Sequence, residues 1–160
     1  MLIVVDRALA DVDALVADAA DYLSRRLGGT PPLDAAALPA DAAGALAAID
    51  AWAGSDVANW RLELIRWFEA HAPVRLVPDP DVNATLRRAA KGGQRLAVAS
   101  ALPPEALELV LQQLGCARAF AVACAGDGSL EDALDGARAA LGGAQAIVAD
   151  RDALLAALTG

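Results

Sequence analysis

Apolar positions along the chain follow two patterns, short continuous runs and stripes with helical spacing. The runs predict four buried strands, at residues 2–5, 95–100, 119–125 and 145–150. Between and after these runs, apolar residues recur at every third or fourth position, which is typical of amphipathic helices. The predicted helices span residues 11–27, 41–53, 55–71, 81–91, 103–114, 130–141 and 152–158. Ser55 is expected to cap the third of them, and Pro73 is expected to stop it.

From residue 79 onward, helices and strands alternate, whereas residues 14–78 are predicted to contain helices only. Strands that alternate with helices form a parallel sheet covered on both faces. We therefore predict an α/β fold with a doubly wound, mostly parallel, Rossmann-like sheet. Its core is expected to comprise residues 1–13 and 79–160, and residues 14–78 to form a small helical cap inserted above the carboxyl edge of the sheet. Because so short a core leaves the sheet trimmed, an exposed strand edge is expected, which favours self-association.

The composition excludes several classes of protein. Of the residues, 57% are hydrophobic and 42 of 160 are alanine, which still leaves enough larger apolar side chains for a packed core. A net charge of −8 argues against nucleic acid and anionic membrane surfaces as partners. No apolar run approaches the roughly 20 residues of a membrane span, and the first residues lack the basic start of a signal peptide, so we expect a cytoplasmic protein. With His71 as the single histidine, a multi-histidine metal site is excluded.

Polar side chains follow three of the four predicted strands. Asp6 comes after the first strand, Ser100 ends the second and Asp150 ends the last. The carboxyl ends of parallel strands meet at one edge of the sheet, where ligands commonly bind. Two carboxylates suit Mg²⁺, and a hydroxyl at the start of a helix suits an anion such as phosphate. The alternative is that these polar residues only mark the points where strands reach solvent.

This order of features resembles the haloacid dehalogenase (HAD) superfamily with a helical cap inserted after its first motif. The stretch RLAVASALPPEALELVLQQLGCARAFAVACAG, residues 95–126, is similar to the second-motif region of phosphoglycolate-phosphatase-like members. The preceding VPDPDVNATLRRAAKGGQ, residues 77–94, resembles the proline-led helix that the family places ahead of that strand. The resemblance implies a phosphatase-like fold with Ser100 as the phosphate-binding hydroxyl.

The first motif of the family, Asp-x-Asp-Gly-Thr-Leu-x-Asp, is degenerate here. The preferred alignment places Val4 at the nucleophile and Asp6 at the general acid/base, whereas a shifted alignment makes Asp6 the nucleophile and puts Ala8 at the acid/base. Valine cannot attack phosphorus, and alanine cannot transfer a proton. Each alignment therefore lacks one catalytic group.

The third and fourth motifs are also incomplete. The family's lysine is missing, because Lys91 precedes the second motif and the expected region offers only Arg138. Asp150 matches the fourth motif, but leucines occupy the positions of its later acid, Leu154 and Leu155. No cofactor is therefore required, and Mg²⁺ is expected only if the site still functions, with Asp6 and Asp150 as its ligands.

Three hypotheses follow from these motifs. The first is a degenerate HAD-like protein, a pseudoenzyme without phosphatase activity that serves as a binding or assembly module. The second is an active HAD-type hydrolase of small phosphate esters that uses Asp6 as nucleophile. The third is an unrelated doubly wound domain that binds a small anion at Ser100, and a sheet without an inserted cap would favour it.

The chain's tryptophans all lie in the predicted cap and suggest where a partner could bind. Trp52, Trp60 and Trp67 are the three tryptophans, and the last two are seven residues apart on one helical face. Exposed, such a stripe would anchor a homodimer or a protein partner through the cap. The alternative is that these side chains pack the cap onto the core.

Overall fold

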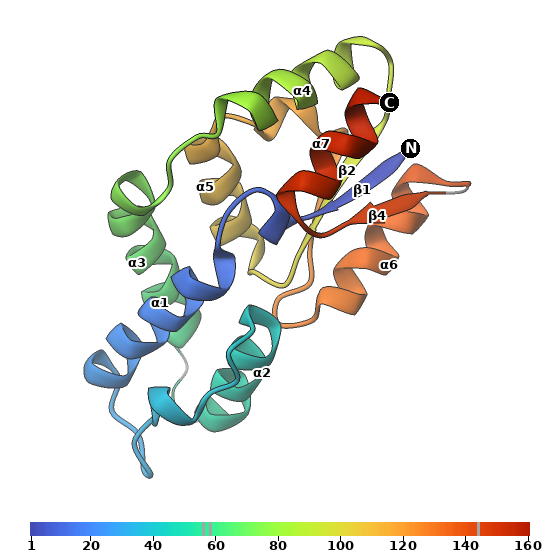
Figure 1. Ribbon diagram of the computed structural model, residues 1–160. Coiled ribbons are helices and arrows are strands. Elements are labelled where there is room, and N and C mark those ends of the chain that lie inside the picture. The colour runs from blue at the N-terminus through green and yellow to red at the C-terminus, as the bar shows by residue number, and fades with distance from the viewer. Residues whose placement is uncertain (56, 58, 144) are drawn as a thin grey trace.

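The computed structural model describes residues 1–55, 57, 59–143 and 145–160, and it has an α/β architecture (Figure 1). Four parallel strands form a sheet in the order β3-β2-β1-β4. The strands are β1 (Leu2–Val5), β2 (Leu96–Ser100), β3 (Val122–Ala125) and β4 (Ala146–Val148). The predicted α/β fold with a parallel sheet is confirmed, and each strand lies within or close to its predicted range.

The helices also match the predicted pattern. Within the described residues they are α1 (Val12–Arg26), α2 (Ala42–Ala53), α3 (Trp60–Arg75), α4 (Pro80–Lys91), α5 (Pro104–Leu114), α6 (Leu130–Leu141) and α7 (Arg151–Thr159). Short 3₁₀ turns are η1 (Asp6–Ala8), η2 (Ala35–Ala37) and η3 (Ala117–Ala119). None of the described helices is both long and apolar enough to cross a membrane.

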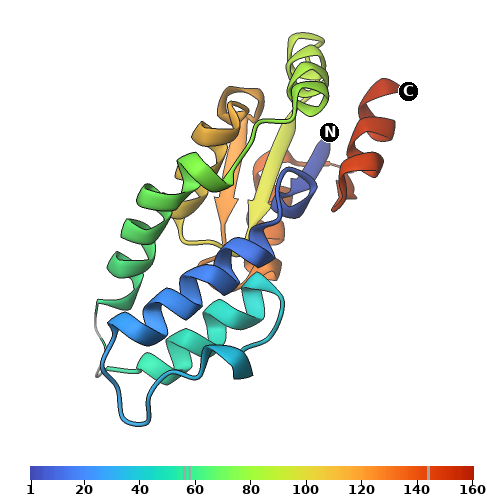
Figure 2. The same ribbon diagram turned by 60° about the vertical axis from the view of Figure 1, so that its left-hand side comes forward.

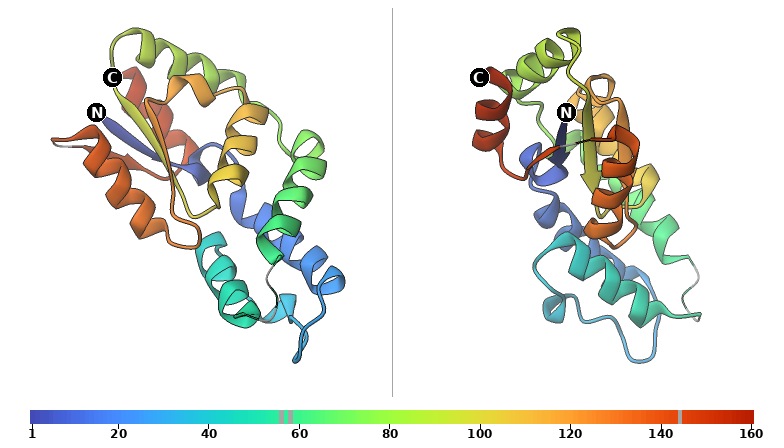
Figure 3. Two further views of the ribbon diagram at one scale, coloured as in Figure 1. Left: turned by 180° about the vertical axis from the view of Figure 1, so that it is seen from behind. Right: turned by 90° about the vertical axis from the view of Figure 1, so that its right-hand side faces the viewer.

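The two faces of the sheet are covered unequally (Figure 3). One face, which includes Ile3 and Ala97, packs against Ala133 and Ala137 of α6. The opposite face, which includes Val98, belongs to the larger core built with α1, α4, α5 and α7. Small alanine side chains on the α6 side let this helix lie close to the strands, which is one use of the alanine-rich composition.

Strand β4 forms an edge of the sheet, as expected for a short core. In the described part of the chain its strand partner is β1, through a register that sets Ile3 opposite Ile147. Helix α6 packs mainly against β2 and β3, and Ile147 of β4 is 43% exposed. Among the described residues, no further strand pairs with the outer side of β4.

Helices α1, α2 and α3 occupy the chain between β1 and α4, and α1 and α2 lie beyond the carboxyl ends of the strands (Figure 2). Helix α1 packs against both α2 and α3, and α3 continues the packing onto α5. Two of these three helices therefore lie near the edge of the sheet where the strand-end residues are found.

The limits of α3 differ from the prediction at both ends. The helix begins at Trp60, not after Ser55, and it continues through Pro73 to Arg75. The predicted stop was wrong because Pro73 lies in the last turn, where its missing N–H removes a single hydrogen bond. The next turn still closes, since the Leu76 N–H donates to the Ala72 carbonyl at 2.9 Å.

Candidate functional site

The carboxyl ends of β1 and β2 bring Asp6 and Ser100 into direct contact. Val5 lies opposite Ala99 in the parallel register, so the residues that follow them are neighbours. The Ser100 hydroxyl donates a hydrogen bond to Oδ2 of Asp6. Ser100 has no exposed surface and Asp6 is 7% exposed. Two of the three predicted strand-end residues therefore meet inside the protein.

Both hydrogen-bonding roles of the Ser100 hydroxyl are used within the chain. While it donates to Asp6, its Oγ accepts the Leu102 backbone N–H at 3.0 Å. A serine hydroxyl has one proton to donate, and here that proton is directed at a carboxylate. Ser100 therefore connects the end of β1 to the turn that leads into α5.

The electrostatics of Asp6 are set mainly by its burial. Loss of hydration raises the pKa of the Asp6 carboxyl from 3.8 to about 6, although the hydrogen bond from Ser100 lowers it. The negative charge of Asp13 adds to the increase, and the positive charge of Arg7 opposes it. Asp6 is therefore an anion at neutral pH and takes up a proton under mildly acidic conditions.

A small cavity of about 260 Å³ opens beside Asp6, between η1 and the N-terminus of α2. Two further carboxylates line it, but both serve the first turn of α2. Asp13 Oδ1 accepts the Ala42 N–H at 2.8 Å, and Asp41 accepts the Gly44 N–H at 2.7 Å as the N-cap. At this volume the cavity is smaller than typical small-molecule sites, which occupy roughly 300–1,000 Å³.

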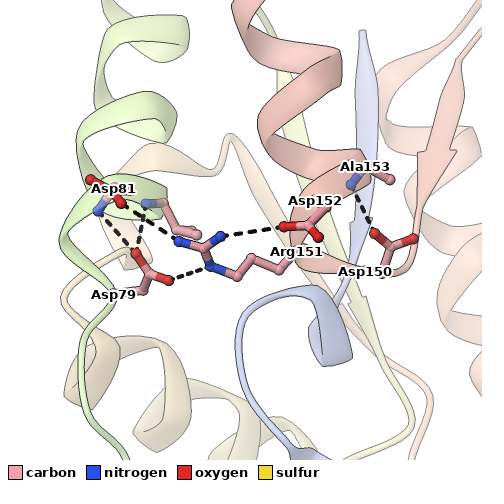
Figure 4. A network of polar contacts seen from close by, with 7 residues as sticks. Asp79, Asp81, Asp150, Arg151, Asp152 and Ala153 are labelled. Atoms are coloured by element: carbon pink, nitrogen blue, oxygen red, sulfur yellow. Dashed lines mark hydrogen bonds and ion pairs between the residues drawn. The ribbon is translucent and has the colours of Figure 1, made fainter.

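Asp150 follows β4 as predicted, but its carboxylate caps a helix. Its Oδ1 accepts the Ala153 N–H at 2.8 Å at the start of α7, and the side chain is turned toward that helix (Figure 4). Among the described residues it shares no hydrogen bond with Asp6 or Ser100. The third strand-end residue is therefore a capping group, as its position before a helix also permits.

Arg151 and the acids around it form a polar network that the sequence analysis missed. Arg151 binds Asp79 at 2.7 Å, Asp81 at 3.6 Å and Asp152 at 3.3 Å, which joins the first turns of α7 and α4 (Figure 4). Its hydrogen bond holds the pKa of the Asp79 carboxyl below the usual value. The sequence shows Arg151 directly after the strand-end acid Asp150, but its partner Asp79 lies 72 residues away in the chain. No local motif could therefore predict this ion pair.

The side chains at this edge do not fit a magnesium ion. Within the described residues, no three His, Cys, Asp or Glu side chains are grouped to hold a metal. Mg²⁺ is usually held by one or two carboxylates that point at the same ion, together with water or phosphate oxygens. Here Asp6 accepts from Ser100 and Asp150 caps α7. Arg7 donates from Nε to the Ala149 carbonyl at 3.1 Å, which adds a positive charge at the end of β4.

The cationic groups of the expected third motif lie elsewhere. Lys91, the single lysine, is exposed at the end of α4, where the chain approaches the amino end of β2. Arg138 forms an ion pair with Asp135 at 2.6 Å on the surface of α6. Neither contacts Asp6 or Ser100, so the described residues place no lysine or arginine in the position that the resemblance implies for the third motif.

The tryptophans serve mainly as packing groups. Trp60 and Trp67 are 3% and 4% exposed, and the Trp67 ring stacks on His71 with centroids 4.4 Å apart. Trp52 is half-buried, and its Nε1 donates to the Pro31 carbonyl at 2.8 Å. Because Trp60 and Trp67 have almost no accessible surface, the packing alternative explains them and the anchor stripe does not.

Comparison with known proteins adds no family assignment: no protein-family model matches the chain, and no curated protein matches it significantly. The resemblance to the HAD superfamily therefore rests on the motifs quoted above and stays a prediction.

Proposed function

We propose that the chain is a degenerate HAD-like protein that does not hydrolyse phosphate esters and serves as a binding or assembly module. The observation that carries the proposal is the state of Ser100. A hydroxyl that binds phosphate must be reachable, yet Ser100 has no exposed surface and its proton is directed at Asp6. We interpret the Asp6–Ser100 pair as a structural contact retained from a catalytic ancestor.

The chemistry of phosphoryl transfer supports the same conclusion. A carboxylate oxygen would attack phosphorus, and the ester oxygen would leave with a proton supplied by a second acid. With Asp6 as nucleophile, Ala8 stands where the acid should be and has no proton to give. With Asp6 as acid, Val4 stands at the nucleophile, inside the sheet opposite Val98. In each alignment, therefore, either the nucleophilic attack or the protonation of the leaving oxygen has no residue to perform it.

An active hydrolase is the second candidate function, because one observation favours the shifted alignment of the first motif. Val4 is the next-to-last residue of β1, whereas Asp6 directly follows the strand and lies beside Ser100. This placement supports the shifted alignment, in which Asp6 is the nucleophile. Asp6 is therefore the residue whose replacement distinguishes the two candidates.

The test measures phosphate release from p-nitrophenyl phosphate and small phosphate esters with Mg²⁺ present. We expect the wild-type protein, Asp6→Asn and buffer to give the same rate. Asp132→Asn is the matched control, since Asp132 is an exposed acid in the first turn of α6. Mg²⁺-dependent release by the wild type and Asp132→Asn that is lost in Asp6→Asn would overturn the proposal and establish the hydrolase.

For the assembly role we propose a homodimer formed through the helices of the predicted cap. With Trp60 and Trp67 buried, the support comes from other apolar side chains. Leu62 and Val74 of α3 are 50% and 75% exposed, and Val77 just beyond the helix is 80% exposed. A contiguous exposed apolar patch marks a site of protein association, and the proposal is that these three side chains form such a patch between two copies of the chain.

Sedimentation velocity at several concentrations tests this role. We expect the wild type to dimerise and Leu62→Glu with Val74→Glu to shift the equilibrium toward monomer. Ile147→Glu, on the exposed edge strand, is the control that should leave the equilibrium unchanged. A monomer at every concentration, or a dimer lost only in Ile147→Glu, would refute assembly through the cap.

A further inference from the structure

A second and larger cavity lies at the opposite end of the sheet from Asp6. Its volume is about 590 Å³, and α4, α5 and η3 form its walls. Helix α4 ends at Lys91 just before β2, and α5 ends at Leu114 and is followed by η3 and then β3 (Figure 1). The cavity lined by these elements therefore lies at the amino ends of β2 and β3. It shares no lining residue with the cavity beside Asp6.

Three cationic side chains line this cavity, on a chain whose net charge is −8. They are Arg87 and Lys91 of α4 and Arg118 of η3. In the described part of the chain none of them forms an ion pair, and no carboxylate lines the cavity. Arg87 uses its Nε for the Asn83 carbonyl at 3.2 Å, which leaves its terminal NH groups for another partner.

The inner wall of the cavity is apolar. Leu111 and Cys116 are both buried, with 3% of their surface exposed, and Ala119 lies beside them. Burial raises the pKa of the Cys116 thiol to about 11, so this sulfur adds no negative charge at neutral pH. The cavity thus combines a cationic rim with an uncharged, apolar interior.

We propose that this cavity binds an organic anion with an apolar body and a carboxylate, phosphate or sulfonate head. The head is placed among Arg87, Lys91 and Arg118, which form no ion pair with the described residues. The body lies against Leu111 and Cys116. The volume falls within the roughly 300–1,000 Å³ of small-molecule sites, and a few convergent polar groups on an apolar wall are typical of them.

Three probes separate the two parts of this recognition. The first is 8-anilinonaphthalene-1-sulfonate, which carries both an apolar body and an anionic head. N-phenyl-1-naphthylamine has the body without the charge, and inorganic phosphate has the charge without the body. By fluorescence and calorimetry we expect saturable one-to-one binding of the first probe, and at least about tenfold weaker binding of each of the others. Equal affinity for the neutral probe would overturn the proposal.

Charge reversal locates the site. Lys91→Glu and Arg118→Glu are each expected to weaken binding of the sulfonate at least about tenfold, because each replaces an attraction by a repulsion. Arg88→Glu is the matched control, since Arg88 lies on the same last turns of α4, is exposed and does not line the cavity. Amide spectra of each variant verify its fold and show whether the Gln112 region responds to the probe. Binding that is equal in all three variants, or that perturbs amides elsewhere, would refute the assignment.

Discussion

The buried carboxyl of Asp6 makes the stability of the protein depend on pH within a defined window. Its pKa is 3.8 in the unfolded chain and about 6 in the folded protein, because burial penalises the charged form. The folded state therefore holds this proton more tightly than the unfolded state. The stabilisation that results is complete below pH 3.8 and is lost as the pH rises through about 6.

Replacing Asp6 by asparagine removes this titration and keeps both the size of the side chain and an oxygen that can accept from Ser100. An increase in pKa from 3.8 to about 6 corresponds to about 3 kcal/mol between the two protonation states. On going from about pH 4 to about pH 8, Asp6→Asn is therefore expected to gain up to about 3 kcal/mol in free energy of unfolding over the wild type.

Urea unfolding followed by tryptophan fluorescence at a series of pH values measures this gain. Subtracting the two curves removes the groups that titrate alike in both proteins. Asp132→Asn is the matched control, because it makes the same replacement at an exposed acid in the first turn of α6. A difference between Asp6→Asn and wild type that stays constant with pH, or that favours the wild type as the pH rises, would refute the reasoning.

Three further changes probe the packing and the caps. Trp67→Ala is expected to cost about 3–5 kcal/mol in urea unfolding, because it empties a buried site, and a loss below about 1 kcal/mol would contradict that packing. Gly126→Ala places a methyl group against the Ser129 carbonyl and should cost roughly 1–3 kcal/mol, whereas a neutral result would mean that the turn can relax. Asp150→Ala removes the cap of α7 and should cost about 1 kcal/mol with or without Mg²⁺. A thermal midpoint that Mg²⁺ raises in the wild type but not in Asp150→Ala would show that Asp150 binds the metal.

The features that the sequence predicted well depend on local pattern. Both faces of the central strand β1 are buried, and strands of this kind are rich in apolar, mostly β-branched residues. The short apolar run at residues 2–5 was therefore enough to predict a buried strand. The pattern also predicted that Asp6 and Ser100 lie at the same edge of the sheet, because parallel strands end there, although it did not predict their hydrogen bond.

The features that the sequence did not predict depend on which helix faces are buried in the folded chain and on the orientation of individual side chains. The spacing of Trp60 and Trp67 identifies one face of a helix, but only the folded chain shows that this face is buried. An acid between a strand and a helix suits both a metal and a cap, and the choice at Asp150 depends on its side-chain orientation. The cationic cavity draws Lys91 and Arg118 from separate elements, so no contiguous motif contains it.

The single ladder that holds β4 has a consequence for how the fold opens. This strand pairs with β1 over three residues, and two of its side chains, Ala146 and Ile147, are exposed. By contrast, β1 and β2 pair over four residues, and all of these residues are buried. Regions with few buried contacts exchange their amide protons first. We therefore expect this margin to open before the rest of the sheet, and such an opening would separate the Arg7 side chain from the Ala149 carbonyl that accepts its hydrogen bond.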